Sequence, residues 1–322
     1  MNYQDKKILS HNDQEIDINI RLSEIKSRLA KDPDKVLSEE LIKLADELSK
    51  SELGSFLIKN CGFNGYWTDI VVTYPYDNHS KIQFSSLDKT ILEKFPVVLA
   101  TQERFRIFRD TLQKLVKDGI IMASIPCGLM RDLLQLDYLT IKNFKLVGID
   151  LDPDSIKRAK VLVEEYGLSS KCEFKQLNAW DLNDKEQVDI ITSNGLNIYE
   201  PNEVRNISLF KNFYSYLKPG GTLITSFLTP PPSAGKDCEW DLSEINEKYL
   251  IMQRNIYMVI LQVKFQCYCS SDSIKVQMKK AGFDQIKIIY DKAKIFPTVI
   301  ASKKSRYPRA YARGTAAMCT LK

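Results

Sequence analysis

The spacing of apolar residues along the chain changes near residue 119. Before that point, apolar residues recur at helical intervals. A leucine stripe over residues 37–48, spaced three or four apart, predicts an amphipathic helix. A second stripe predicts a helix over residues 102–116, with Thr101 as its N-cap. The segment between them, residues 61–76, is rich in glycine and aromatic residues and does not read as a regular helix.

After residue 119, short apolar runs alternate with amphipathic segments. The runs predict strands over residues 120–125, 144–149, 172–177, 188–193, 222–227, 286–290 and 298–302. The segments predict helices over residues 129–136, 153–166, 202–217, 242–263 and 273–281. Strands that alternate with helices form parallel βαβ units. The expected fold class is α/β, a Rossmann-like, doubly wound, mostly parallel seven-stranded sheet with a helical N-terminal cap.

Three parts are expected along the chain: a helical cap over residues 1–118, an α/β domain over 119–302 and a basic tail over 303–322. The tail carries six basic residues and no acid, so without it the net charge of +5 becomes −1. Its composition differs from the rest of the chain, and we expect a disordered or appended end. The body offers no basic surface pattern, which makes nucleic acid an improbable partner.

Composition excludes further classes of protein. No apolar run has the roughly 18–20 residues that a membrane span needs. The first twenty residues are polar, with no secretory signal, and the seven cysteines are odd in number and lack a C-x-x-C pair. We therefore expect a cytoplasmic protein with reduced thiols and no membrane partner. With only two histidines, no metal site is expected.

Polar residues follow several of the predicted strands, where a doubly wound sheet binds its ligands. Asp150 ends the second strand and could accept hydrogen bonds from ribose hydroxyls, or only cap a turn. After the third strand, Asn178 and the Ala179 N–H could bind the edge of an adenine. Trp180 could lie against the purine or at the edge of the core.

The end of the fourth strand is also polar. Asn194 and Gly195 follow it directly, which suggests a binding site rather than packing. Asn197 and Tyr199 come next and could contact a substrate, or be turn and rim residues.

Residues 119–302 resemble a class I S-adenosylmethionine-dependent methyltransferase. The resemblance is carried, in order, by VGIDLDPDSIKRAK, NAWDL, VDIITSNGLNIY, LKPGGTLITSF and KKAGFDQIKIIYDKAKIFPTVIASK. The whole chain, including FNGYWTDIVVTYP, VVLATQERF and ASIPCGLMRDLL, is similar to a group of bacterial methyltransferase-like proteins with a helical N-terminal cap. The implied cofactor is S-adenosyl-L-methionine. The implied cofactor-binding residues are Ile125, Pro126, Cys127, Gly128, Asp150, Leu151, Asn178, Ala179, Trp180, Asn194 and Gly195.

The glycine-rich loop departs from the family pattern of an acid followed by three glycines. Ser124 stands where the acid is expected, Pro126 replaces the first glycine and Met130 the last. Gly128 fits the central glycine and lets the backbone approach the amino acid end of the cofactor. The altered loop leaves three outcomes open: another residue supplies the contact to the cofactor's amine, the cofactor binds weakly, or turnover is lost.

The N-terminal part could complete the site. Tyr66 and Trp67 could form a lid that contacts the substrate, or join the cap to the sheet. Arg104 and Gln102 could reach the cofactor carboxylate, or lie on a solvated helix face.

Few residues are available as a catalytic base. His79 lies in a polar loop and is an improbable one, whereas Tyr199, Glu200 or Asp241 could take a proton from a hydroxyl. A carboxylate needs no base, and an amine needs only to arrive neutral. The Asn-Pro-Pro-Tyr motif of amino-directed enzymes is absent, because residues 194–197 read NGLN.

We expect methyl transfer to a small-molecule acceptor. Three alternatives stay open: a non-catalytic protein that binds the cofactor, an enzyme that acts on a protein or nucleic acid through the basic tail, and a nicotinamide-dependent oxidoreductase. The absence of G-x-G-x-x-G counts against the last. The oligomeric state does not follow from the sequence.

Overall fold

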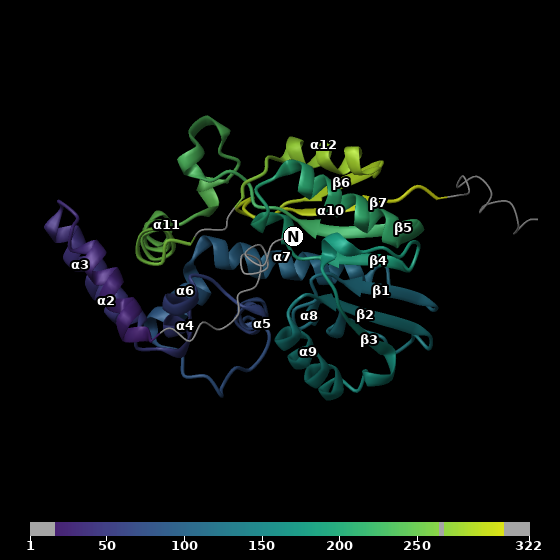
Figure 1. The fold of residues 1–322 in the computed structure, drawn as a ribbon, viewed down its shortest axis with the longest axis horizontal. Helices are drawn as coiled ribbons and strands as arrows, with labels where there is room; N and C mark the ends of the chain where they lie inside the picture. Colours follow the sequence, from purple (N-terminus) through teal and green to yellow (C-terminus); the bar gives the residue numbers. More distant parts are fainter. Residues whose placement is uncertain (1–16, 264–266, 306–322) are drawn as a thin grey trace, which may run out of the picture.

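One sheet organises the computed structural model, which describes residues 17–263 and 267–305. Within the described residues the sheet has seven strands in the order β3-β2-β1-β4-β5-β7-β6 (Figure 1). The strands are β1 (Ile120–Ser124), β2 (Phe144–Asp150), β3 (Cys172–Gln176), β4 (Val188–Ser193), β5 (Leu217–Ser226), β6 (Gln285–Ile289) and β7 (Thr298–Ser302). Strands β1 to β5 are parallel, and β7 pairs antiparallel with both β5 and β6. The expected fold class is confirmed.

The strand ends agree with the apolar pattern at most positions. Strands β4 and β7 have the predicted limits, and β1, β2, β3 and β6 differ by one residue. Strand β5 starts five residues earlier than predicted, at Leu217. The reason is that Leu217 already pairs with Val188 of β4. The Pro-Gly-Gly segment, which was expected to end the preceding helix, therefore lies within β5, at a shift in the register between the two strands.

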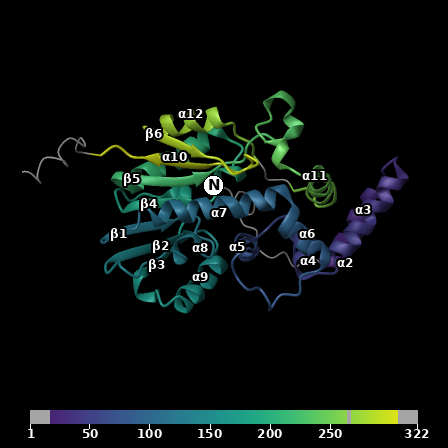
Figure 2. The same ribbon diagram turned by 180° about the vertical axis from the view of Figure 1, so that it is seen from behind.

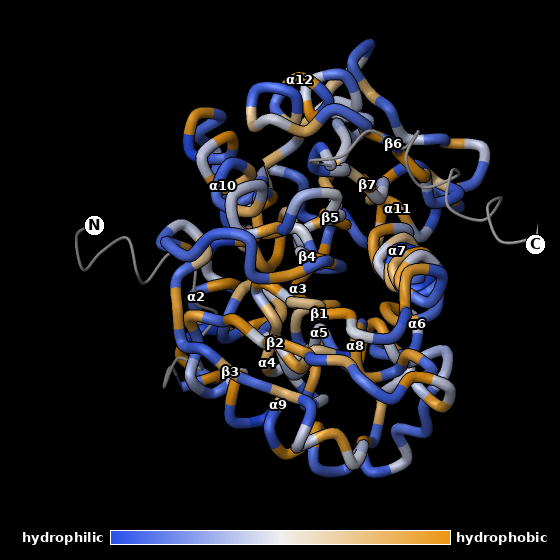
Figure 3. Tube along the Cα trace, turned by 90° about the vertical axis from the view of Figure 1, so that its right-hand side faces the viewer, coloured by the Kyte–Doolittle hydropathy of each residue, from blue (hydrophilic) through white to orange (hydrophobic). Residues whose placement is uncertain are grey.

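Helices cover both faces of the sheet, as a doubly wound fold requires. On one face lie α7 (Pro96–Gln113), α8 (Arg131–Leu134) and α9 (Pro153–Glu165), and on the other α10 (Glu203–Tyr216) and α12 (Ser271–Ala281) (Figure 2). Asp152 caps α9 as predicted, since its carboxylate accepts from the backbone N–H of Asp154 and Ser155. In Figure 3 the chain around β1 and β2 is largely hydrophobic, whereas the surrounding loops are largely hydrophilic.

The N-terminal helices pack together to one side of the sheet (Figure 1). They are α2 (Ile18–Leu29), α3 (Lys35–Leu48), α4 (Glu52–Asn60), α5 (Gly65–Thr73) and α6 (Ser86–Lys94). Their shared core also includes Ile256, Tyr257 and Ile260 from the C-terminal half of the chain. The guanidinium of Arg28 on α2 donates to the carbonyls of Val259 and Ile260, which fastens this later segment to the cap. The division of the chain at residue 118 stays a prediction.

Two N-terminal helices differ from the expectation. Residues 61–76 contain α5, whose N-cap Asn64 accepts from the Trp67 N–H at 2.9 Å. Most of α5 is buried, so it lacks the amphipathic pattern that would have indicated a helix. Helix α7 begins at Pro96, six residues before the predicted start, because proline at the first helical position starts a helix well. Thr101 is therefore inside α7 and is not its N-cap.

Two later helices are shorter than predicted. Residues 242–263 do not form one helix: a 3-10 turn over Leu242–Glu244 precedes α11 (Glu247–Arg254), which continues as a π-helical turn over Asn255–Ile260. Residues 129–136 contain only α8, since Met130 has left-handed backbone geometry and blocks an earlier start. Of the basic tail, residues 306–322 lie outside the described residues. None of the described helices is long and apolar enough to cross a membrane.

Candidate functional site

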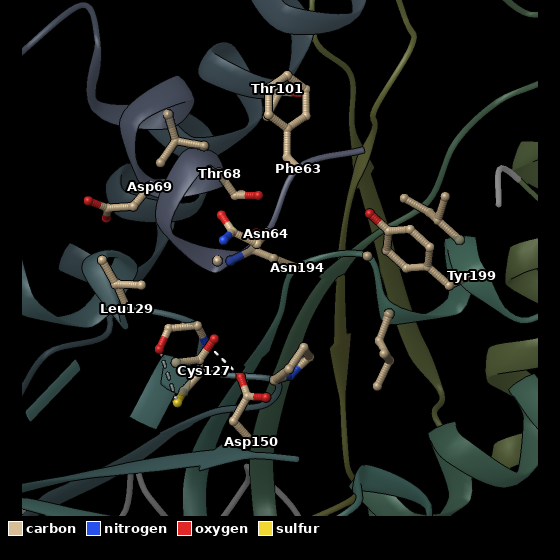
Figure 4. A pocket seen from close by; sticks show the side chains of 18 of the residues that line it. Phe63, Asn64, Thr68, Asp69, Thr101, Cys127, Leu129, Asp150, Asn194 and Tyr199 are labelled. Atoms are coloured by element: carbon tan, nitrogen blue, oxygen red, sulfur yellow. Dashed lines mark hydrogen bonds between the residues drawn. The ribbon is translucent and has the colours of Figure 1, made fainter. Parts of the chain in front are cut away.

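A cavity of about 360 Å³ lies between the cap and the carboxyl ends of the parallel strands. Its floor is formed by the residues that follow β1, β2, β3 and β4. Its walls come from α5 and α7, together with Leu228, Tyr257 and Phe296. Figure 4 shows Asp69 and Leu129 on one side of this cavity and Tyr199 on the other.

Asp150, at the end of β2, holds the loop that follows β1. One carboxylate oxygen accepts from the Gly128 N–H at 2.9 Å, and the other accepts from the Asp152 N–H at 3.0 Å. Asp150 is 9 % exposed and lines the cavity, and burial raises the pKa of its carboxyl. The structure thus gives Asp150 the turn-capping role and also places it where a ligand could reach it.

The loop after β1 keeps an open backbone despite its unusual sequence. Gly128 has φ +48°, and a Cβ built there would meet no atom within 4 Å. Met130, at the position of the third family glycine, has φ +60°, also in the left-handed region. Ile125, Pro126 and Cys127 line the cavity beside Gly128. Gly128 and Met130 therefore both have left-handed backbone geometry, although only one of them is a glycine.

A buried acid that the sequence did not single out lies behind this loop. Asp132, on α8, is 3 % exposed and lines the cavity. Its carboxylate accepts from the Thr192 hydroxyl and, at 3.3 Å, from the hydroxyl of Ser124. Burial raises the pKa of Asp132. An acid from α8 thus contacts Ser124, the residue that stands where the family pattern has its own acid.

The residues after β3 form a second polar corner. Ala179 is buried, and Asn178 caps the turn by accepting from the Trp180 N–H at 3.1 Å. The Trp180 indole N–H donates to the carbonyl of Arg205 at 3.0 Å, which fixes the ring. All three residues line the cavity, as does Leu151 after β2.

The residues after β4 divide between the cavity and the core. Asn194, Gly195 and Tyr199 line the cavity. Burial raises the pKa of Tyr199, and the positive charge of Arg104 opposes that shift. Asn197 is buried but is not a lining residue, so the expected substrate contact of Asn197 is not supported.

Gln102 and Arg104 on α7 are both buried, so they do not lie on a solvated helix face. Gln102 donates to the carbonyl of Leu92 and does not line the cavity. Arg104 does line it and is 7 % exposed. Its Nη1 donates to the Ser226 hydroxyl at 3.3 Å, and the guanidinium lies 4.8 Å from the centre of the Phe296 ring. Burial lowers the pKa of Arg104 to about 10, so it is still a cation at neutral pH.

Tyr66 and Trp67 do not line the cavity, and the lid interpretation is not supported. Trp67 is 4 % exposed within the core of the cap, and Tyr66 lies against Arg158 of α9, 5.0 Å from ring centre to guanidinium. Trp67 therefore packs within the cap, and Tyr66 connects the cap to α9.

The same helix, α5, nevertheless closes one side of the cavity. Its residues Thr68 and Asp69 line the cavity, and Asp69 pairs with Arg131 of α8 at 2.8 Å. Burial raises the pKa of Asp69 to about 6, against the opposing effect of Arg131. At its start, Gly65 packs so closely on α9 that a Cβ would come within 2.8 Å of the Ser155 hydroxyl. The ion pair holds α5 against α8, and the close approach of Gly65 holds it against α9.

Of the candidate bases, Tyr199 alone lines the cavity. Asp241 forms an ion pair with Lys294 at 3.1 Å outside it, so the expected catalytic role of Asp241 is not supported. Glu200 pairs with Arg205, and His79 contacts the Thr73 hydroxyl at 3.1 Å. Within the described residues, no group of three or more His, Cys, Asp or Glu side chains could hold a metal ion.

Comparisons with known proteins give a match to a family model and several similar solved structures. The family model described as "Methyltransferase domain" matches residues 124–221. A structure described as a possible exported protein from Bordetella parapertussis is 35 % identical, with a TM-score of 0.83 over 90 % of this chain and 98 % of that one. No curated protein matches the sequence.

More distant solved structures include two methyltransferases. An O-methyltransferase family protein from Burkholderia thailandensis is 14 % identical, with a TM-score of 0.49 over 64 % of this chain and 57 % of that one. The phosphoethanolamine N-methyltransferase 2 of Haemonchus contortus, in complex with S-adenosyl-L-methionine, is 14 % identical, with a TM-score of 0.46 over 62 % of this chain and 53 % of that one.

Proposed function

Because the chain belongs to the class I S-adenosylmethionine-dependent methyltransferases, we propose that it transfers a methyl group from this cofactor to a small-molecule acceptor. The observation that carries the proposal is the pairing of Asp150 with the Gly128 loop at the floor of the cavity. It combines a buried acid and an open backbone at adjacent strand ends, which is where a nucleotide-like ligand binds in this type of sheet.

The lining residues fit the parts of the cofactor. In the proposed placement, Asn178, Ala179 and Trp180 bind the adenine, and Asp150 accepts hydrogen bonds from the ribose hydroxyls. Gly128 leaves room for the amino acid end, since a side chain there would project into open space.

Asp132 is the proposed acceptor for the cofactor's ammonium group. It has the carboxyl group that Ser124 lacks, and the hydroxyls of Ser124 and Thr192 donate to that group. In this proposal, an acid on α8 replaces the acid that the loop lacks. The proposal thus takes the first of the three outcomes that the altered loop leaves open, in which another residue contacts the cofactor's amine.

When bound, S-adenosylmethionine supplies a methyl group activated by a positively charged sulfur. The chain's main task is then to hold the acceptor in line with that methyl group and to exclude water. The walls that α5 and α7 provide support both effects. Tyr199 is the proposed base for a hydroxyl acceptor, and an amine or a carboxylate would need none.

The position of the cavity favours a small acceptor over a macromolecule, because its walls come from both the cap and the strand ends. We also propose a cytoplasmic location. The six cysteines in the described part of the chain are all free, as in a reducing compartment.

Calorimetric titration with S-adenosylmethionine tests the proposal, with NAD as the control ligand. We expect micromolar binding of S-adenosylmethionine, no binding of NAD, and a loss of at least about tenfold in Asp150→Ala, because a hydrogen bond to a charged group contributes about 1.5–3 kcal/mol. Asp154→Ala is the matched control: this acid, four residues further on, is exposed and does not line the cavity. A folded wild-type protein that binds neither ligand would refute the function, and equal binding by Asp150→Ala would refute the role of Asp150.

A further inference from the structure

The cavity has a cationic end that none of the contacts proposed for the cofactor uses. Arg104 is 7 % exposed, and its only hydrogen bond within the described residues is the one from Nη1 to the Ser226 hydroxyl. Its Nε is buried without a partner. No carboxylate of the described residues lies within ion-pair distance of the guanidinium. A buried charge without a counterion is unfavourable and therefore uncommon in proteins.

The charged and titratable groups nearest to Arg104 do not neutralise it. The carboxylate of Asp291 acts on it only at longer range, since its two oxygens accept from the backbone N–H groups of Ile295 and Phe296 at 3.0 and 2.7 Å. The phenol of Tyr199 is neutral at physiological pH because burial raises its pKa. The part of the chain that the structure describes thus offers Arg104 no counterion, and a bound anion would supply one.

The position of Arg104 in the fold separates it from the proposed cofactor contacts. Arg104 bonds to Ser226, at the end of β5, and lies against Phe296, just before β7. Asp150 and Gly128 follow β2 and β1, and β4 lies between those strands and β5. With the adenine at β3, the ribose at β2 and the amino acid end at β1, the space at β5 is left for the acceptor.

The surroundings of Arg104 indicate what else the ligand carries. Arg104 lies against the ring of Phe296, which packs with Leu228 and Val97, and these apolar side chains line the cavity. Tyr257 also lines the cavity, and its hydroxyl is buried without a hydrogen-bond partner. One end of the ligand should thus be anionic and its body apolar.

We propose that the acceptor is a small carboxylic acid with an apolar body, and that the guanidinium of Arg104 binds its carboxylate. A guanidinium edge matches the two oxygens of a carboxylate. The proposal rests on the proposed function, because it names the substrate class of that site. It predicts that acids bind where their uncharged amides do not.

Ligand-observed NMR titrations with the protein saturated in S-adenosylhomocysteine test the proposal. The probes are benzoate, phenylacetate and hexanoate, each paired with its amide. We expect at least one acid to bind wild-type protein about tenfold or more tightly than its amide, and Arg104→Gln to remove that preference. Arg104→Lys should retain part of it. Arg106→Gln is the matched control, because Arg106 is on the exposed side of the same helix and pairs with Glu103 and Asp110.

The outcomes separate this inference from the proposed function. If S-adenosylhomocysteine binds but every acid and its amide bind equally, or none binds at all, the inference fails and the function stands. If Arg104→Gln keeps the acid preference but binds S-adenosylhomocysteine tenfold more weakly, Arg104 binds the cofactor carboxylate and the inference fails. If wild-type protein binds neither S-adenosylmethionine nor S-adenosylhomocysteine, the proposed function fails first. Circular dichroism spectra of the variants identify any loss of fold.

Discussion

Replacing Arg104 by methionine should stabilise the ligand-free protein. Burial lowers the pKa of Arg104 from 12.5 to about 10, which corresponds to a penalty of about 3 kcal/mol for the buried charge. Methionine removes the charge and packs among the apolar residues around Phe296. It also loses the hydrogen bond to Ser226 and the contact of the guanidinium with the Phe296 ring, about 1 kcal/mol each, so the expected gain is about 1 kcal/mol.

Equilibrium unfolding in urea measures this gain as a higher midpoint with an unchanged slope. The matched control is Arg106→Met on the exposed side of α7, which should lose no more than about 1 kcal/mol because surface ion pairs contribute little. A loss of stability of 1 kcal/mol or more in Arg104→Met would refute the reasoning. It would mean that the protein itself satisfies Arg104, which would remove the argument for a ligand carboxylate.

Two further predictions concern acids at the cavity. Asp132→Asn should weaken S-adenosylmethionine binding about tenfold or more in calorimetry, since it removes the charge while preserving the size of the side chain; unchanged affinity would refute the proposed ammonium contact. Asp69 has a pKa raised to about 6 by burial, so the stability that its protonated form contributes is complete below about pH 4 and is lost as the pH rises through 6. Urea midpoints should therefore favour Asp69→Asn over wild type more at pH 7.5 than at pH 4.5. The opposite trend would show that the ion pair with Arg131 outweighs burial.

The sheet was predictable because most of its strands are short runs rich in apolar residues and separated by clear breaks. Parallel strands buried on both faces read as apolar runs, and the parallel strand β4 ends where its run ends. The polar residues after β2 and β3 were predictable for the same reason, since the strand end determines which side chains face the cavity. Asp150 and Asn178 are examples.

The walls of the cavity were not predictable in this way. Tyr66 and Trp67 are aromatic like many lid residues, but a buried helix directs them into the cap, and nothing local shows that α5 is buried. Arg104 reads as part of a polar helix face, and only contacts with Ser226 and Phe296, more than 120 residues away in sequence, make it part of the site. Asp132 was not predictable, because the family pattern has its acid at the end of the first strand, where this chain has Ser124, and Asp132 lies on α8.

Acidic and basic side chains lie at opposite ends of the cavity, and this arrangement affects where a cofactor and an acceptor would bind. Asp132 and Asp150 lie at the β1 and β2 ends, and Arg104 lies at the β5 end. In a buried site, unlike in water, such charges act strongly on a ligand. In the proposed placement, the ammonium and sulfonium of the cofactor lie near these acids and the carboxylate of the acceptor lies at Arg104. With Asp132 of α8 as the proposed acid in place of one at the end of β1, the altered loop and the buried arginine are compatible with one methyl-transfer site.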